Sequence, residues 1–387
     1  MDNKVFYHWN EPESVHQYRT GVSLHSHTNH SQEGLEFIPR LSQRIPFAHW
    51  ALTQKISKCS TSTGIKVDLD NAYWTPPLTA RMAYDLEAGQ ITEKLRLSPL
   101  VSLTDHDTIE ANSLLTVMEG GSEVPISVEW SVLFHGVMLH LGIHNLPHSR
   151  AQMIMSHLAA YTADPQRHRL GELIESLHLI PGVLIVMNHP LWDLYGNGDQ
   201  VHRNAVGLFL KKHGQFVHAL ELNGLRSWEE NRKVRQLAEG WNLPTISGGD
   251  RHGCEPNATL NLTNAATFAE FAEEVRKDRM SHVLLMPQYM EPIQLRILQT
   301  VLDAVREYPA RAPEEQRWDG RVFHPSKDGT CLPLRTMWHK GSPFFIEAIL
   351  FLLRQFERGL LRNALRYTLH DEKKIRMALE PVTGATK

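Results

Sequence analysis

Three histidines follow a short apolar run near the N-terminus. The segment GVSLHSHTNHSQEGLEF, residues 21–37, begins like a buried strand and then places His25, His27 and His30 within six positions. Alternate residues of a strand point to the same side, so His25 and His27 are expected to face one side together. Two neutral imidazoles on one face can share a metal ion. This spacing predicts that His25 and His27 are metal ligands, whereas His30, beyond the expected strand end, is not.

Polar residues also end most of the later apolar runs. They are Asp105 and His106 in LVSLTDHD, Glu129 in VPISVEW, His189 in GVLIVMNHP, Glu221 in HALELNG, and Asp250 and His252 in PTISGGDRH. Asp250 and His252 repeat the spacing of the first pair, and a short turn around Gly136 would fold His140 back beside Glu129. Mixed imidazole and carboxylate ligands suit Zn²⁺, Mn²⁺ or Fe²⁺ better than Mg²⁺.

Short apolar runs alternate with amphipathic segments along the first three quarters of the chain. The runs cover residues 21–27, 100–107, 124–130, 137–144, 182–190, 218–224, 244–252 and 282–287. Near-continuous apolar strands separated by helices predict an α/β fold with a parallel sheet. Eight such runs fit a barrel better than an open sheet, and the carboxyl ends of barrel strands converge on one face, where active sites form.

Two regions lie outside this pattern. Residues 37–75 separate the first strand from its helix and contain Trp50, Tyr73 and Trp74. They are either a lid or rim over the site or an ordered surface excursion. Residues 291–387 have helical periodicity, which indicates packing against a neighbouring element or a homo-oligomer interface. The expected division is a barrel domain over 1–290, with the insertion at about 37–75, and a mainly helical extension over 291–387.

Composition limits the class of protein. The 387 residues are 42% hydrophobic with a net charge of −3, which gives no general attraction for nucleic acid or an anionic membrane. The three cysteines are widely spaced, which disfavours a disulfide framework and a thiolate zinc site. We find no signal-peptide pattern and no apolar run near the ~18 residues of a membrane span. We therefore expect a soluble, cytoplasmic protein that does not contact a membrane.

Taken together, these motifs resemble those of the PHP (polymerase and histidinol phosphatase) family. SLHSHTNHSQEG resembles its H-x-H-T-x-x-S opening, and SLTDHDTIEA its second motif. VEW followed by GVMLHLGIH is similar to the third motif, VMNHP to the fourth and ISGGDRHG to the last. All occur in family order over roughly residues 20–290, with spacing most similar to the stand-alone metal-dependent phosphoesterase branch.

The resemblance implies a distorted (β/α)7 TIM-like barrel with two or three divalent metal ions. The implied ligands are His25, His27, Glu129 and Asp250 for the first ion, Glu129 as a bridge with His140 and His189 for the second, and His106 and His252 for the third. Family members commonly place an aspartate directly after the serine of the first motif. Here Gln32 follows Ser31 and Glu33 comes next, so Glu33 is the predicted remaining ligand.

The implied activity is hydrolysis of a phosphate ester of a small metabolite or nucleotide by a metal-bound hydroxide. Glu129 is the central catalytic residue. Asp105 would orient a ligand or a water, or cap the structure. Arg251 would assist catalysis or contact a phosphate, although strand alternation points it away from the metals, and Asn223 would contact substrate.

Three other functions are open at this stage. A phosphodiesterase or exonuclease on short oligonucleotides is one, with nucleic acid only as a substrate and Trp50 and Trp74 as stacking groups. An amidohydrolase-like enzyme is another, although the TDHD and DRH pair favours the phosphoesterase. The last is a metal-binding regulatory module with weakened catalysis, to which Gln32 points.

Overall fold

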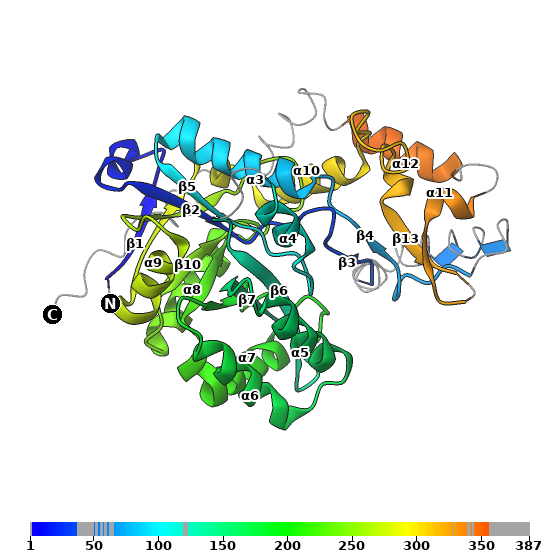
Figure 1. Cartoon of the computed structure of the whole chain (residues 1–387). Coiled ribbons are helices and arrows are strands. Elements are labelled where there is room, and N and C mark those ends of the chain that lie inside the picture. The colour runs from blue at the N-terminus through cyan, green and yellow to red at the C-terminus, as the bar shows by residue number, and fades with distance from the viewer. Residues whose placement is uncertain are drawn as a thin grey trace.

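The computed structural model describes residues 2–36, 66–118, 123–326, 328–338 and 344–355, and residues 50, 53, 54, 57, 60, 61 and 342. Most of the predicted insertion between residues 37 and 65, and the C-terminal residues 356–387, therefore lie outside the described residues. The strands within the described part form two five-stranded sheets and one four-stranded sheet (Figure 1).

The first sheet has the strand order β1-β12-β11-β2-β5. Its strands are β1 (Asp2–Tyr7), β2 (Thr20–Leu24), β5 (Ser98–Ser102), β11 (Thr259–Thr263) and β12 (Met280–Leu285). β1 pairs with β12, and β2 with β5, in parallel. β11 runs antiparallel to both of its neighbours, so this sheet is mixed.

The second sheet has the order β10-β9-β8-β7-β6. Its strands are β6 (Ile126–Phe134), β7 (Val137–Leu146), β8 (Leu184–Asn188), β9 (Ala219–Asn223) and β10 (Thr245–Gly248). β8, β9 and β10 are parallel, whereas β6, β7 and β8 pair antiparallel. The β6–β7 turn has φ values of 52° at His135 and 82° at Gly136, the left-handed conformation of a two-residue hairpin. This confirms the predicted short turn.

The prediction of a closed, parallel (β/α)7 TIM-like barrel is wrong. The two large sheets are separate and mixed, and isolated bridges join them at Ser26–Arg251 and His106–Glu129. The physical reason is that β6 and β7 are buried over most of both faces, so the sequence predicts each of them as a strand of a parallel sheet. Hydrophobicity alone does not distinguish a buried hairpin from two strands linked by a helix.

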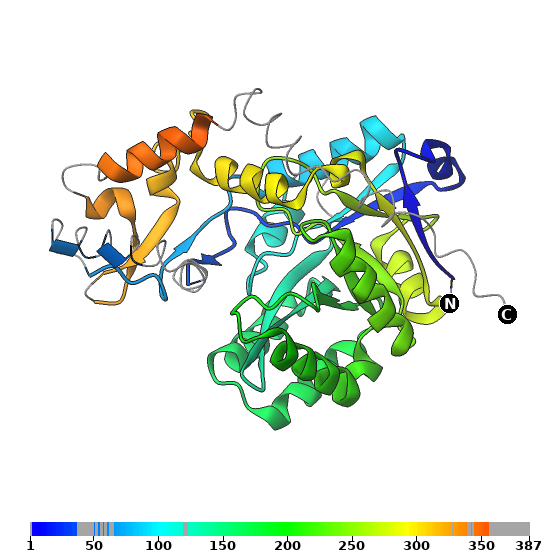
Figure 2. The same cartoon turned by 180° about the vertical axis from the view of Figure 1, so that it is seen from behind.

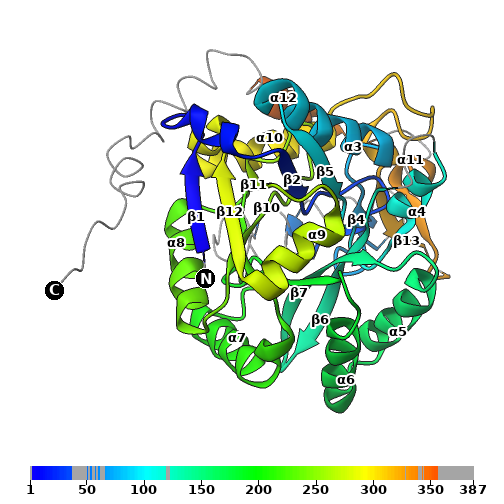
Figure 3. The same ribbon diagram turned by 60° about the vertical axis from the view of Figure 1, so that its left-hand side comes forward.

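Helices lie around the outer side of the two large sheets (Figure 3). They are α3 (Ala80–Gly89), α4 (Glu110–Thr116), α5 (Ala151–Ala163), α6 (Arg167–His178), α7 (Asp199–His213), α8 (Trp228–Gly240) and α9 (Phe268–Glu273). π-helical turns extend α3 over Gln90–Leu95 and α9 over Glu274–Asp278, and short 3-10 helices span Pro12–Gln17, Gly214–Phe216, Pro287–Met290 and Trp318–Gly320. The Thr79, Ser227 and Thr267 side chains cap α3, α8 and α9 by accepting backbone N–H groups.

The core lies between the second sheet and helices α5 to α8. Trp130, Leu141, Ile143, Ile174 and Phe209 are fully buried there. None of the helices in the described part of the chain is long and apolar enough to span a bilayer.

The third sheet joins segments far apart in sequence. Its order is β14-β13-β4-β3, with β3 (Glu33–Gly34), β4 (Tyr73–Trp74), β13 (Val322–Pro325) and β14 (Cys331–Pro333). It lies beside α11 (Leu334–Met337) and α12 (Phe344–Gln355), while α10 (Ile293–Val305) runs back toward the large sheets (Figures 1 and 2). The C-terminal part therefore contains strands as well as helices, and the predicted division at residue 290 cuts across this sheet. The predicted contact between copies through the C-terminal helices stays a prediction.

We expect Gly142→Ala to lower the free energy of unfolding by about 1–3 kcal/mol, the usual cost of overpacking a core. A Cβ at Gly142 would lie 2.8 Å from Asn188 Oδ1 and 2.8 Å from His144 Nε2, and both of these side chains are buried. Urea denaturation measures the effect. Gly207→Ala is the matched control, because nothing lies within 4 Å of its Cβ and it sits inside α7. Equal stability of the two variants would contradict the tight packing at Gly142.

Candidate metal centre

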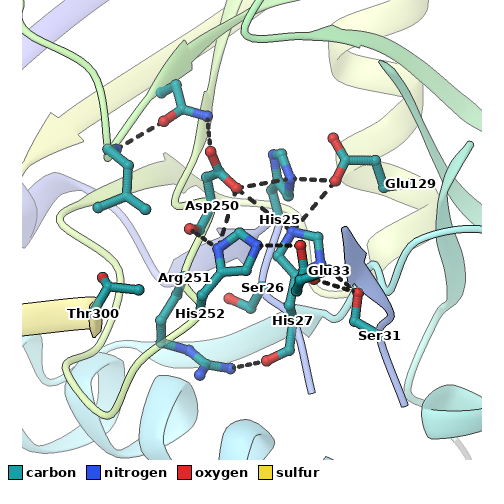
Figure 4. Close-up of polar contacts among 12 residues, drawn as sticks. His25, Ser26, His27, Ser31, Glu33, Glu129, Asp250, Arg251, His252 and Thr300 are labelled. Atoms are coloured by element: carbon teal, nitrogen blue, oxygen red, sulfur yellow. Dashed lines mark hydrogen bonds and ion pairs between the residues drawn. The ribbon is translucent and has the colours of Figure 1, made fainter. Parts of the chain in front are cut away.

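The nine predicted metal ligands lie together where the two large sheets and β3 meet. They are His25, His27, Glu33, His106, Glu129, His140, His189, Asp250 and His252. Figure 4 shows His25, His27, Glu33, Asp250 and His252 pointing toward one another, with Glu129 beside them. All nine are buried or nearly so.

Glu129 is at the centre of this group. Its Oε2 atom lies 3.0 to 3.4 Å from one ring nitrogen each of His25, His27 and His106. Its Oε1 atom lies 3.2 Å from His189 Nε2 and 3.3 Å from His140 Nδ1. Each carboxylate oxygen therefore faces its own set of imidazoles, which is the arrangement expected of a bridging ligand.

Glu33 gathers a second set of imidazoles. Its Oε2 atom lies 3.0 Å from His252 Nε2 and 3.4 Å from His106 Nε2, and its Oε1 atom lies 3.5 Å from His27 Nδ1. Ser31 Oγ donates a hydrogen bond of 2.6 Å to Oε1 and fixes the carboxylate. The structure thus puts Glu33 where the sequence analysis expected the remaining ligand.

His30 is outside the group. Its Nδ1 atom pairs with the exposed Glu110 at 3.1 Å, as the predicted contrast between His30 and the other two histidines requires.

The donor atoms fit divalent metal ions. Three groups have ligand atoms within 4.8 Å of one another: His27, Glu33, His106 and His252; His25, His27 and Glu129; and His106, Glu129 and His140. Asp250 Oδ1 lies 3.5 to 3.6 Å from His25, His27 and His252. Within the described residues, the buried His27 Nε2 and His106 Nδ1 atoms have no hydrogen-bond partner. Buried ring nitrogens without a hydrogen-bond partner are positions that a metal ion could occupy once any proton there is released.

Strand alternation does not explain why His25 and His27 converge. β2 ends at Leu24, and His25 has a φ of 62°, in the left-handed region that non-glycine residues seldom adopt. Asp250 also has a positive φ, of 56°, and its backbone N–H donates to His25 O at 2.7 Å. The predicted pairing is therefore right, but its cause is a strained turn at the end of the strand, as is common in functional sites.

Carboxylates and backbone carbonyls orient the imidazoles from behind. Glu221 Oε1 lies 2.5 Å from His25 Nδ1, and Glu221 Oε2 accepts the backbone N–H of His189 at 2.7 Å. His252 Nδ1 lies 2.8 Å from Asp250 O. Such contacts leave the opposite ring nitrogen free to ligate a metal. The sequence analysis noted Glu221 at a strand end but assigned it no role; its spacing of two from Asn223 was the available signal.

The side chains of Asp105 and Asn223 form hydrogen bonds with other residues of the chain. The buried Asp105 accepts hydrogen bonds from Thr28 N at 2.6 Å and Thr28 Oγ1 at 2.7 Å, which holds the first histidine loop. Burial raises the pKa of Asp105 to about 6. Asn223 Nδ2 donates to Glu221 and Asp250. These placements support positioning roles and do not support the predicted substrate contact of Asn223.

Arg251 points away from the metal centre. Its guanidinium donates to Glu87 Oε1 at 2.8 Å, to Gly253 O at 2.8 Å and to His27 O at 3.1 Å, and the residue is buried. The direction is the one that strand alternation suggested, although Arg251 lies beyond the end of β10 (Thr245–Gly248), and the alternative of a phosphate contact is not supported. Glu87, from α3, was not found from the sequence because a single glutamate inside a helix gives no motif.

Aromatic rings approach the centre from two sides. The Trp74 ring centroid lies 6.1 Å from that of His252, and the Trp192 ring lies 5.0 Å from that of His189. Trp74 on β4 therefore lies beside the centre, while a lid or rim formed by residues 37–75 stays a prediction. Trp50 is exposed, and its neighbours lie outside the described residues.

The carboxylates and imidazoles of the centre shift one another's pKa values. Burial would raise the pKa of Glu129, but His25, His106 and His140 hold it well below its usual range. Burial would lower the pKa of His106, yet Glu33 and Glu129 raise it to about 10. Burial and the neighbouring His252 lower the pKa of His27 to about 3. Protons on some imidazoles therefore balance the carboxylates, and metal ions would have to displace them.

No family model matches the chain, and no curated protein does. An amidohydrolase from Chromobacterium violaceum, solved with sulfate and no metal, aligns over 46% of this chain and 83% of its own, with 16% identity and a TM-score of 0.30. An inferred metal-dependent phosphoesterase from Bifidobacterium adolescentis aligns over 52% and 92%, with 14% identity and a TM-score of 0.30. Likeness at this level carries no argument, so function is argued from the centre itself.

We expect Glu33→Ala to weaken Mn²⁺ binding by tenfold or more, because three imidazoles lose the carboxylate that they share. Elemental analysis after dialysis at controlled Mn²⁺ measures the loss. His30→Ala is the control from the same loop and should keep its metal within about threefold, a difference of well under 1 kcal/mol. If His30→Ala loses metal and Glu33→Ala does not, the assignment of this loop is reversed.

Metal affinity should rise with pH between about 6 and 8, by up to tenfold per unit for each proton displaced. In the metal-free protein the pKa of His106 is about 10, so its imidazole carries a proton throughout this range and must release it to ligate. Competition titrations with a chelator at several pH values measure the slope. His106→Asn should reduce the slope by about one proton. An affinity that is constant with pH would show that the imidazoles are not protonated.

Proposed function

We propose that the chain is a metal-dependent hydrolase of phosphate esters, of the kind that its resemblance to the PHP family implies. The observation that carries the proposal is the position of Glu129, a fully buried carboxylate whose two oxygens each face a different set of imidazoles. When bound there, neighbouring divalent ions activate a water and neutralise charge on phosphoryl oxygens.

The protein's own groups hold and orient this centre. Glu129 would be a metal ligand, and Glu221 holds the His25 ring and the His189 backbone. Asn188 Nδ2 donates 2.9 Å to Glu129 Oε1 and limits rotation of the carboxylate. The site is thereby preorganised, so little reorganisation accompanies charge development in the substrate.

A side-chain nucleophile is not favoured. The hydroxyls nearest the ligands are already donors: Ser31 Oγ to Glu33, and Thr28 Oγ1 to Asp105. Both hydroxyls are thereby engaged in holding the first histidine loop, and Ser31 Oγ also lies 3.2 Å from His27 Nδ1. Attack by water is therefore the better supported route.

The substrate is proposed to be a small phosphate monoester. A phosphodiesterase on short oligonucleotides is the second candidate, favoured by the Trp74 and Trp192 rings at the two ends of the centre, which could stack on bases. An amidohydrolase-like site usually needs a metal-bridging lysine or carboxylate, so Glu129 fits both kinds of enzyme, and it is the TDHD and DRH pair that favours the phosphoesterase. The complete set of ligands argues against a module that has lost catalysis.

We expect Glu129→Gln to reduce hydrolysis of p-nitrophenyl phosphate by at least about a hundredfold, because a neutral amide cannot balance two cations. Steady-state kinetics on Mn²⁺- and Zn²⁺-loaded protein measures this, with bis-p-nitrophenyl phosphate as the diester comparison. Circular dichroism checks the fold, and Glu239→Gln on exposed α8 is the control. Unchanged turnover with normal metal content would contradict the catalytic role of Glu129.

A further inference from the structure

A guanidinium beside the metal centre has donors that the fold leaves unused. Arg226 lies in the loop between β9 and α8, and its side chain is only 14% exposed. The carbon of its guanidinium lies 3.6 Å from the ring centroid of Trp192. Its Nε atom is buried and makes no hydrogen bond to any residue that the structure describes. Stacking on an indole uses the face of a guanidinium and leaves its N–H edge available.

Asp250 does not satisfy this edge. Arg226 NH2 lies 3.8 Å from Asp250 Oδ2, which is too long for a hydrogen bond. That oxygen already accepts from Asn223 Nδ2 at 3.2 Å. The other oxygen of Asp250 faces His25 and His27 in the centre. The Asp250 carboxylate therefore lies between Arg226 and the imidazoles of His25 and His27.

Two other buried arginines nearby use all three of their side-chain nitrogens. Arg251 donates from them to Glu87 Oε1, Gly253 O and His27 O. Arg296 donates from them to the carbonyls of Glu291, Gly224 and Arg226. Arg226 differs from both, because its buried Nε has no partner among the described residues. An unpaired buried donor is costly, so a ligand that accepts from this edge would be stabilised.

Trp192 holds the guanidinium in place. Its ring lies nearly perpendicular to that of His189, at 82°, so it is packed against a candidate metal ligand. Arg226, stacked on this indole, is fixed relative to the centre before any substrate arrives. Glu33, Glu129, Glu221 and Asp250 would otherwise repel an anion, and Arg226 is the cation that opposes them from the side of Asp250.

We propose that Arg226 binds the non-bridging oxygens of the substrate's phosphoryl group through its N–H edge, with Trp192 as its positioning residue. The inference rests on the proposed function and deepens it, because it makes the substrate an oxyanion that spans Arg226 and the metal centre. A planar fork of two N–H groups matches two oxygens of a tetrahedral anion, which a lysine ammonium does not.

Inorganic phosphate is the probe, and isothermal titration of Mn²⁺-loaded full-length protein is the measurement. Arg226→Met keeps the apolar stem on Trp192 and removes the fork, so the Kd for phosphate should rise at least tenfold with metal content unchanged. Arg226→Lys keeps the charge and should recover only part of the affinity. Arg232→Met, an exposed arginine of α8, is the matched control and should bind as the wild type does.

The outcomes separate the inference from the proposed function. Failure of the metal-loaded wild type to bind phosphate or hydrolyse either ester would overturn both. Equal phosphate affinity of Arg226→Met and wild type would overturn the role of Arg226 alone. Loss of metal together with phosphate in Arg226→Met would also overturn it, because the arginine would then act only by supporting Asp250. If the methionine variant does not fold, Arg226→Lys decides between the same outcomes.

Discussion

The buried charge of Glu129 is the constraint on which the rest of the structure depends. A carboxylate with no exposed surface is costly to hold in a protein interior unless positive charge compensates it. Here no lysine or arginine pairs with it within the described residues; imidazoles from β7 and from the ends of β2, β5 and β8 surround it instead. Imidazole can balance the charge either as a proton carrier or as a metal ligand. The charge of the centre is therefore compatible with an exchange of protons for divalent metal ions.

The Glu87 network holds the backbone that carries these imidazoles. Glu87, fully buried on α3, accepts hydrogen bonds from Ser23 Oγ, Arg251 Nε and the backbone N–H of Asn257. Asn257 Nδ2 in turn donates to Leu24 O and to the Ser26 hydroxyl. The end of β2 and the loop after β10 are thus tied to one helix residue, which stabilises the strained turns at His25 and Asp250. A mutation at Glu87 would act on the centre without touching it.

The candidate ligands could be predicted from the sequence because several of them are ligand-type residues two positions apart. The pairs His25–His27 and Asp250–His252, and the turn at Gly136, are local signals, and they hold even though the strand argument for the first pair does not. Arg226 and Trp192 could not be found in this way, since each is a single residue whose role depends on a contact across the fold. The barrel prediction failed for a similar reason. Strand direction depends on long-range pairing, and the buried strand β7, antiparallel to both neighbours, has no pattern that reveals it; β11 was not among the predicted runs.

The third sheet connects the C-terminal part of the chain to the metal centre, because it contains both β13 and the strand β3 that carries Glu33. Glu33 on β3 pairs with Trp74 on β4, and Trp74 pairs with Val322 on β13. The ring of Tyr73 also stacks on Phe323 at 4.9 Å. If the docking of residues 322–325 holds Glu33 in this register, it would strengthen cation binding by the same coupling free energy by which a cation would strengthen the docking, because linkage is reciprocal. A change that weakens the packing of the β13–β14 hairpin would then also lower the affinity of the centre for a cation, although Glu33 lies far from this hairpin in sequence.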